Sequence, residues 1–205
     1  MWSKFLFGGA LSGLLALSAA AQNTPAEGTP TRIRGTVEKF DGQTLTVKSR
    51  EGAELTIALA PNFTVSAVVK KNLADIKTGD YVGAASLKGG DGKLHALEVL
   101  IFPEAMRGTG EGERSWDLTP DSLMTNATVT GIAAATQGQA LKVAYKGGES
   151  EIVVASDVPI VTFGPGDASL LKPGAAFILT AQKKADGTFS TNRVTAEKDG
   201  VKPPM

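Results

Sequence analysis

Ile76-Lys77-Thr78-Gly79 recurs 95 residues later in the chain as Leu171-Lys172-Pro173-Gly174. Gly79 and Gly174 stand where a type II turn needs a positive φ angle, and Pro173 stands where that turn favours proline. The two stretches therefore predict the same turn twice. They indicate a chain built from two copies of one unit.

Further matches extend the repeat in both directions. An offset of 96 or 95 residues joins Leu45-Thr46-Val47 to Leu141-Lys142-Val143, Val65 to Val161, Asp91-Gly92 to Asp186-Gly187, and Val99 to Val194. Upstream, Val37 matches Val129 at an offset of 92, so the second copy carries four extra residues in its first hairpin, around residues 133–138. Hairpin tips tolerate insertions of this kind.

Each copy shows the pattern of an all-β fold. Short alternating runs rich in Val, Ile, Leu and Thr are separated by glycine-containing turns. In the first copy they predict six strands and one helical turn near Leu73, with the strands at residues 33–40, 44–49, 53–59, 63–69, 81–87 and 94–102. Closure removes exposed edges. We expect two tandem, partly open OB-like barrels of six strands each, at residues 33–102 and 127–197, related by internal duplication.

The two ends of the chain differ from the copies. Residues 1–21 combine Lys4, a short apolar stretch and Ala19-Ala20-Ala21, which predicts a signal peptide cleaved after Ala21 and a periplasmic or secreted protein. No later stretch reaches about 18 continuous apolar residues, so we do not expect an integral membrane protein after cleavage. Residues 22–32 and 198–205 predict a disordered lead-in and a disordered tail.

The charge and the cysteine content narrow the class of protein. The chain has 21 basic and 21 acidic residues, and loss of Lys4 with the signal peptide leaves it nearly neutral. Nucleic-acid binding draws most of its affinity from basic stripes, so we do not expect it here. No cysteine is present, which excludes disulfides and a lipid anchor on cysteine.

The repeated motifs also resemble a family of small β-domains of unknown function in exported bacterial proteins. The resemblance rests on Gly35-Thr36-Val37, on Asp41 to Val47, on Ile76 to Asp80 and on Asp91 to Leu94. It implies an OB-like fold. The whole chain looks like secreted proteobacterial proteins often labelled as metal ABC transporter permeases, a label that conflicts with the lack of membrane spans after Ala21.

The sequence predicts no catalytic or cofactor-binding residue. His95 is the only histidine, so one chain cannot assemble a multi-histidine metal site or a histidine-based triad. No Gly-x-Ser-x-Gly elbow occurs. The glycines of residues 108–112 have the wrong spacing for a phosphate-binding loop and are interpreted as a flexible loop.

The segment between the copies, residues 103–126, has no counterpart in the repeat. Its acidic residues are candidate calcium ligands, but no EF-hand motif is present and we do not expect a metal site; the candidates are Glu111, Glu113, Asp117 and Asp121. Met106, Met124 and His95 are a second candidate set, for copper(I).

Trp116, Leu118 and Met124 give the same segment an apolar side. Trp116 is the only tryptophan after residue 2. We interpret these residues as an anchor between the two copies, or as an anchor for a partner, because both uses exploit large apolar area.

These observations favour an exported, non-enzymatic binding or scaffolding protein of the bacterial cell envelope, whose partner is an envelope protein or a small ligand. The first alternative is a periplasmic accessory protein that handles metal ions through residues 103–126. The second is an enzyme that acts on an envelope polymer through paired carboxylates.

Overall fold

The computed structural model describes residues 28–203, so the predicted signal peptide lies outside the described residues. The first copy consists of five strands and one 3-10 turn: β1 (Thr29–Phe40), β2 (Thr44–Ser49), β3 (Glu54–Lys71), η1 (Leu73–Asp75), β4 (Tyr81–Lys88) and β5 (Leu94–Ile101). No helix within residues 28–203 has the length and apolarity to cross a membrane. The all-β prediction is confirmed.

The second copy has the same order, with its third strand divided into two, after a connecting segment that contains η2 (Glu104–Met106) and β6 (Gly112–Ser115). Its elements are β7 (Leu123–Ala135), β8 (Gly138–Tyr145), β9 (Gly148–Ala155), β10 (Ile160–Pro165), η3 (Ala168–Leu170), β11 (Ala176–Lys183) and β12 (Phe189–Ala196). The glycines of the two predicted turns, Gly79 and Gly174, have φ angles of +96° and +85°. The turns therefore have the backbone conformation that the repeat predicts.

Five strands, not six, close each barrel. The predicted strands 53–59 and 63–69 are one continuous strand, β3, which passes through Pro61. Pro61 falls in a gap in the ladders, because the pairing with β2 ends at Ala58 and the pairing with β12 skips from Leu59 to Thr64. A strand tolerates proline at such an interruption, where no ladder hydrogen bond needs its missing N–H.

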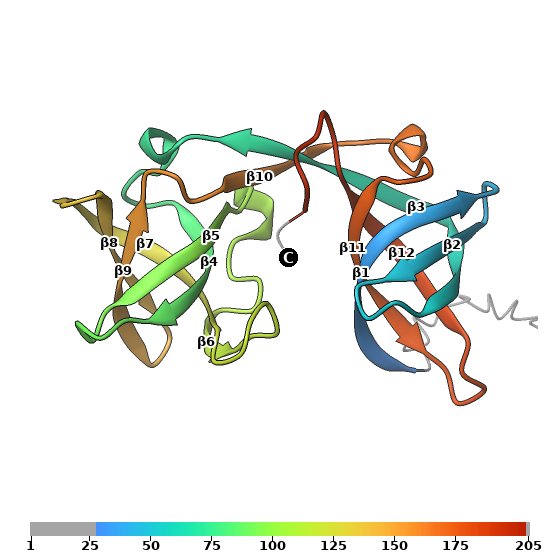
Figure 1. The fold of residues 1–205 in the computed structure, drawn as a ribbon, viewed down its shortest axis with the longest axis horizontal. Helices are drawn as coiled ribbons and strands as arrows, with labels where there is room; N and C mark the ends of the chain where they lie inside the picture. Colours follow the sequence, from blue (N-terminus) through green and yellow to red (C-terminus); the bar gives the residue numbers. More distant parts are fainter. Residues whose placement is uncertain (1–27, 204–205) are drawn as a thin grey trace, which may run out of the picture.

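The strands pair in two closed rings, which Figure 1 shows as two lobes. The first barrel has the order β1-β2-β3-β12-β11 and closes from β11 back to β1. The second barrel has the order β7-β8-β9-β5-β4 and closes from β4 back to β7. Each barrel takes three strands from one copy and two from the other.

The barrels therefore do not follow the boundaries 33–102 and 127–197 that the repeat predicts. After leaving the first barrel, β3 runs on towards the second, and β10 runs in the opposite direction (Figure 1). Residues 66–71 of β3 pair antiparallel with residues 160–165 of β10. This crossing pair carries each copy's last two strands into the other barrel. Periodicity and turn residues are the same whichever barrel a strand joins, so local sequence does not reveal the exchange.

The strand registers relate the two copies by a constant offset of 95 from the third strand onward. Leu45 lies opposite Ile57, and Leu141 lies opposite Ile152. The change of offset from 96 to 95, a one-residue deletion in the second copy, therefore falls in the turn between the second and third strands, whereas the sequence comparison kept the offset of 96 as far as Val65 and Val161. At the crossing, Val68 pairs with Phe163, 95 residues further on. The register is symmetric about this pair, since Ala67 lies opposite Gly164 and Val69 lies opposite Thr162.

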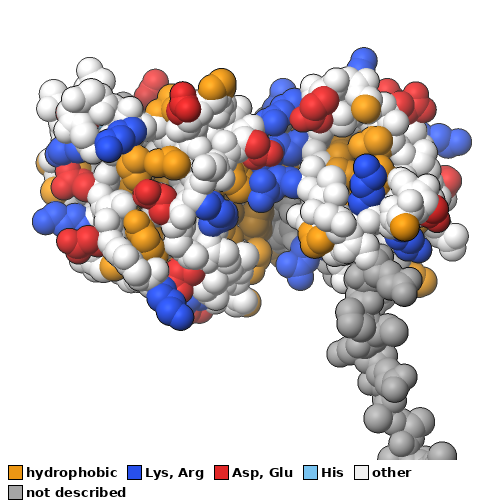
Figure 2. All heavy atoms as spheres, turned by 90° about the horizontal axis from the view of Figure 1, so that it is seen from below, with side chains coloured by type: hydrophobic (Ala, Val, Ile, Leu, Met, Phe, Trp, Pro, Cys, Tyr) orange, Lys and Arg blue, Asp and Glu red, His pale blue; other side chains and the backbone are white. Residues whose placement is uncertain are grey.

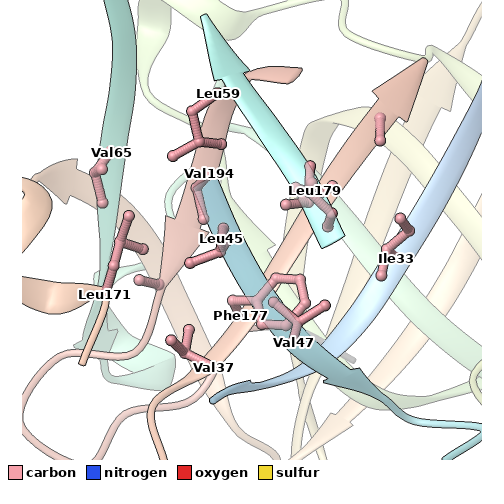
Figure 3. Close-up of a cluster of buried hydrophobic side chains, with 13 residues drawn as sticks. Ile33, Val37, Leu45, Val47, Leu59, Val65, Leu171, Phe177, Leu179 and Val194 are labelled. Carbon is pink, nitrogen blue, oxygen red and sulfur yellow. The ribbon is translucent and has the colours of Figure 1, made fainter. Parts of the chain in front are cut away.

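Each barrel encloses its own hydrophobic core, and each core mixes the two copies. In the first barrel Phe177 of β11 is fully buried with Val37, Leu45 and Val47 of the first copy (Figure 3). In the second barrel Val82 and Val99 of the first copy are buried with Val143 of the second. Neither copy retains a complete core without the other.

Residues 29–32 and 198–203, which the sequence places in a disordered lead-in and a disordered tail, are folded in the structure. The first strand begins at Thr29, four residues earlier than predicted, because residues 29–32 pair with β11 of the other copy. The predicted tail folds back as a turn with a bridge between Lys198 and Val201, and Pro203 is buried. Residues 204 and 205 lie outside the described part of the chain.

A double-mutant cycle tests the exchange of strands. We expect Phe177→Ala to lower the free energy of unfolding by about 3–5 kcal/mol, and to couple to Val47→Ala by about 1 kcal/mol because both side chains fill one core. Val143→Ala is the matched control, since Val143 is the equivalent of Val47 in the other barrel. Urea unfolding should give additive effects for Phe177 with Val143. Coupling to Val143 in place of Val47 would contradict the strand pairing.

Candidate functional site

The first half of the connecting segment is bound to the second barrel. β6 pairs with residues 123–126 of β7. The carbonyl oxygen of Thr109 accepts hydrogen bonds from Tyr81 Oη (3.2 Å) and Asn126 Nδ2 (2.9 Å), and Arg107 donates to the carbonyl oxygen of Gly79 (2.9 Å). The segment is therefore part of the folded structure and not a free tether.

The second half of the segment reaches the first barrel. The Trp116 ring lies 4.0 Å from the guanidinium carbon of Arg32 and 5.2 Å from that of Arg34, both on β1. Asp117 accepts a hydrogen bond from Arg34 (2.6 Å) through its side chain, and its carbonyl oxygen accepts one from Arg50 (2.9 Å). Trp116 and Asp117 thus connect the segment on the second barrel to β1 of the first.

Arg34 is the buried centre of this contact. It lies on the outer face of β1, because its neighbour Ile33 points into the core, yet its side chain is only 3% exposed. Its Nε and Nη2 atoms and Trp116 Nε1 are buried without a hydrogen-bond partner. The hydrogen bond from Arg34 holds the pKa of Asp117 below its ordinary value. Burial, together with the charge of Arg34, lowers the pKa of Arg32.

The other candidate residues of the segment do not gather at one point. Glu111 accepts from the backbone N–H of Lys146, and Glu113 accepts from the hydroxyl groups of Thr125 and Ser150. Asp121 is exposed in a turn with a φ angle of +62°. Within residues 28–203 no three His, Cys, Asp or Glu side chains come close enough to hold a metal ion. The four acidic candidates therefore form no shared cation site.

Leu118 and Met124, predicted with Trp116 as an anchor, occupy different environments. Met124 lies on β7 and is 8% exposed, whereas Leu118 is half-buried in the turn that follows Asp117. The contact with β1 is made by Trp116 and the polar Asp117. The search for an anchor considered apolar side chains alone. It therefore missed the part that Asp117 and the three arginines of the first barrel take in this contact, although the sequence shows two arginines at the start of β1.

A second candidate site is a hollow of about 680 Å³ on the second barrel, which we name the β8–β9 hollow. It is lined by the turn before β5, by the β7–β8 hairpin and by the outward faces of β5, β8 and β9. Its charged side chains are Asp91, Lys93, His95, Lys142 and Glu151. Alanines form much of the remaining lining, and no aromatic side chain contributes to it.

The charged groups of the hollow form two pairs. Lys93 Nζ lies 2.5 Å from Glu151 Oε1, and this hydrogen bond raises the pKa of Lys93 and lowers that of Glu151. His95 Nε2 lies 3.1 Å from Asp91 Oδ1, and the hydrogen bond lowers the pKa of Asp91. Because these four side chains are 35–49% exposed, a ligand with charged groups can exchange partners with them.

The insertion found in the sequence builds one wall of this hollow. The β7–β8 pairing extends to Ala135 and Gly138, and residues 133–137 all line the hollow. The equivalent β1–β2 pairing in the first barrel ends at Phe40 and Leu45. Sequence reasoning recognised the insertion but treated it only as a tolerated lengthening. It considered His95 as a candidate metal or triad residue and did not connect it with the insertion.

Comparisons with protein-family models, with curated proteins and with solved structures gave no match to this chain. The candidate functions therefore rest on the residues and their geometry.

Asp117→Asn tests the contribution of the Asp117–Arg34 pair. At neutral pH we expect a loss of about 1–2 kcal/mol in the free energy of unfolding, because Arg34 remains buried without its anion; the half-exposed position of Asp117 keeps the loss below that of a fully buried pair. The folded-state pKa of Asp117 is lowered. Its contribution is therefore complete above the ordinary aspartate pKa and is lost as the pH falls through the lowered value.

Urea unfolding at neutral pH and at about pH 2 measures this difference. The gap between the native protein and Asp117→Asn should close at the lower pH. Asp121→Asn is the matched control, because Asn tolerates the positive φ angle at this position and Asp121 is exposed. An equal loss in both variants would rule out a specific role for Asp117.

Proposed function

We propose that this chain is an exported binding protein of the cell envelope and that its ligand occupies the β8–β9 hollow. The observation that carries the proposal is the hollow itself, in which an insertion present in one copy meets charged side chains from the other. A volume of about 680 Å³ lies within the range of small-ligand sites. The predicted signal peptide supports a periplasmic or secreted location.

We assign each ring to the OB type and regard the two copies as products of an internal duplication. In both rings the third strand lies beside the fifth and parallel to it, and the fourth lies beside the first. OB folds bind ligands on the face of strands 2 and 3 and with the loops 1–2 and 4–5. In the second barrel these are β8, β9, the β7–β8 turn and the β4–β5 turn, the elements that line the hollow. The analogy with OB folds indicates only where a ligand binds. The kind of ligand has to be inferred from the residues that line the hollow.

The lining favours a short polar chain with charges of both signs, as in a peptide. Lys93 and Lys142 can pair with carboxylates, and Asp91 and Glu151 can pair with amines. The floor of small side chains, Ala140 and Ala155 among them, allows a backbone to approach closely. Single-stranded nucleic acid is disfavoured, because the lining has no aromatic ring for base stacking and its charges nearly cancel.

A titration of the isotope-labelled protein followed by nuclear magnetic resonance tests this function. The probe is a short peptide with one lysine and one glutamate, and the neutral control peptide has serine at both places. We expect saturable shift changes at residues 133–137 with the charged peptide, and none at the equivalent first-barrel turn around Gln43. Lys142→Glu should weaken binding about tenfold through loss of a charged contact.

Lys48→Glu supplies the matched charge change, at an exposed position of β2 in the first barrel, and should leave binding unchanged. A response centred outside the hollow, an equal response to both peptides, or a response to oligothymidylate alone would contradict the proposal.

A further inference from the structure

Four arginines surround Trp116 and Asp117. Arg32 and Arg34 come from β1, Arg50 follows β2, and Arg114 lies on β6 of the connecting segment, with its guanidinium 5.5 Å from the Trp116 ring. The carboxylates that pair with these arginines are Asp117 and Glu51, the latter 3.5 Å from Arg50. The cluster therefore holds more positive than negative charge. Figure 2 shows Lys and Arg side chains gathered where the two lobes meet.

The carboxylate of Asp117 pairs with only some of the hydrogen-bond donors of these arginines. One carboxylate oxygen lies 2.6 Å from Arg34 Nη1, and the other lies 3.4 Å from Arg32 Nη1, close to the limit for a hydrogen bond. Arg34 Nε and Nη2 have no partner although the side chain is 97% buried. A buried charged donor without a partner is costly, and a guanidinium fits bidentate oxyanions well. The two oxygens of the Asp117 carboxylate are therefore too few to pair with all the guanidinium donors of the cluster.

The first barrel fixes the relative positions of the arginines that would bind such an anion. Arg32 and Arg34 lie two residues apart on one face of β1, as strand geometry requires. The backbone N–H of Arg50 donates to the carbonyl oxygen of Arg34 (2.8 Å), which fixes the third arginine beside the second. The entry side is open, since the Asp117 side chain is 50% exposed and that of Arg32 is 37% exposed.

We propose that Arg32, Arg34 and Arg50 form a binding site for a phosphate- or sulfate-type oxyanion, and that Asp117 occupies it as an internal substitute. An oxyanion with three or more free oxygens replaces the carboxylate and moves Trp116 away from Arg34, which frees the two unpartnered donors for the ligand. Binding thereby loosens the contact between the connecting segment and the first barrel. The oxyanion can be a free ion or the headgroup of a lipid, because both present the same oxygens.

The fluorescence of Trp116 reports this exchange. The experiment uses the full chain with Trp2→Phe, so that Trp116 is the only tryptophan. Inorganic phosphate is titrated against sodium chloride at equal ionic strength. We expect a saturable change in the emission with phosphate alone. Arg32→Gln and Arg50→Gln should each weaken binding about tenfold, the effect of one charged hydrogen bond.

Two further variants separate the proposal from a purely structural contact. Arg193→Gln removes an exposed arginine from β12 of the same barrel and should leave the phosphate affinity unchanged. Asp117→Asn removes the competing charge and should tighten phosphate binding about tenfold. No saturable change with phosphate or with lipid vesicles, an equal effect of Arg193→Gln, or weaker binding in Asp117→Asn would overturn the proposal.

Vesicles identify the source of the oxyanion. Phosphatidylcholine vesicles with and without phosphatidic acid are added to the same protein. Binding that needs phosphatidic acid, is lost in Arg32→Gln and is stronger than that of free phosphate assigns the site to a lipid headgroup. A response to free phosphate without binding to these vesicles assigns it to a soluble oxyanion.

Discussion

The antiparallel pair of β3 and β10 is the interaction on which the rest of this structure depends. Residues 66–71 and 160–165 continue the third strand of each copy beyond its barrel, and their pairing commits the following strands to the opposite barrel. Both rings then close with strands from the other copy, and both cores contain side chains of both. Each copy therefore contributes to the stability of both barrels.

The connecting segment provides a second, polar link between the barrels. Its first half is hydrogen-bonded to the second barrel, and its Trp116 and Asp117 contact three arginines of the first. The crossing strands are a ladder of backbone hydrogen bonds, whereas this link consists of side-chain contacts of Trp116 and Asp117, and the carboxylate of Asp117 is half-exposed. Of the two, the segment is the one that an anion in solution can open, and the proposed peptide site on the second barrel lies outside it.

Sequence reasoning reached the all-β class of fold and the positive φ angles in the turns at Gly79 and Gly174, and it located the longer hairpin near residue 135, because local residue types indicate each of these features. It missed the exchange of strands, since β11 fits beside β1 as well as β4 would and no local signal selects between them. It divided β3 at Pro61, because proline usually ends a strand. In the connecting segment it identified Trp116 from its apolar area, but the role of Asp117 depends on Arg34, 83 residues earlier in the chain. The β8–β9 hollow escaped notice because its walls come from different copies.

Cross-strand nuclear Overhauser effects between backbone protons test the exchange of strands most directly. We expect Arg34 of β1 to show contacts to Ile178 of β11, its partner in the first barrel. If each copy closed its own barrel, the partner of Arg34 would instead be Gly83, which is 95 residues before Ile178. Contacts between residues 34 and 178 in dilute monomeric protein would establish the exchange within one chain. Contacts between residues 34 and 83 would contradict it.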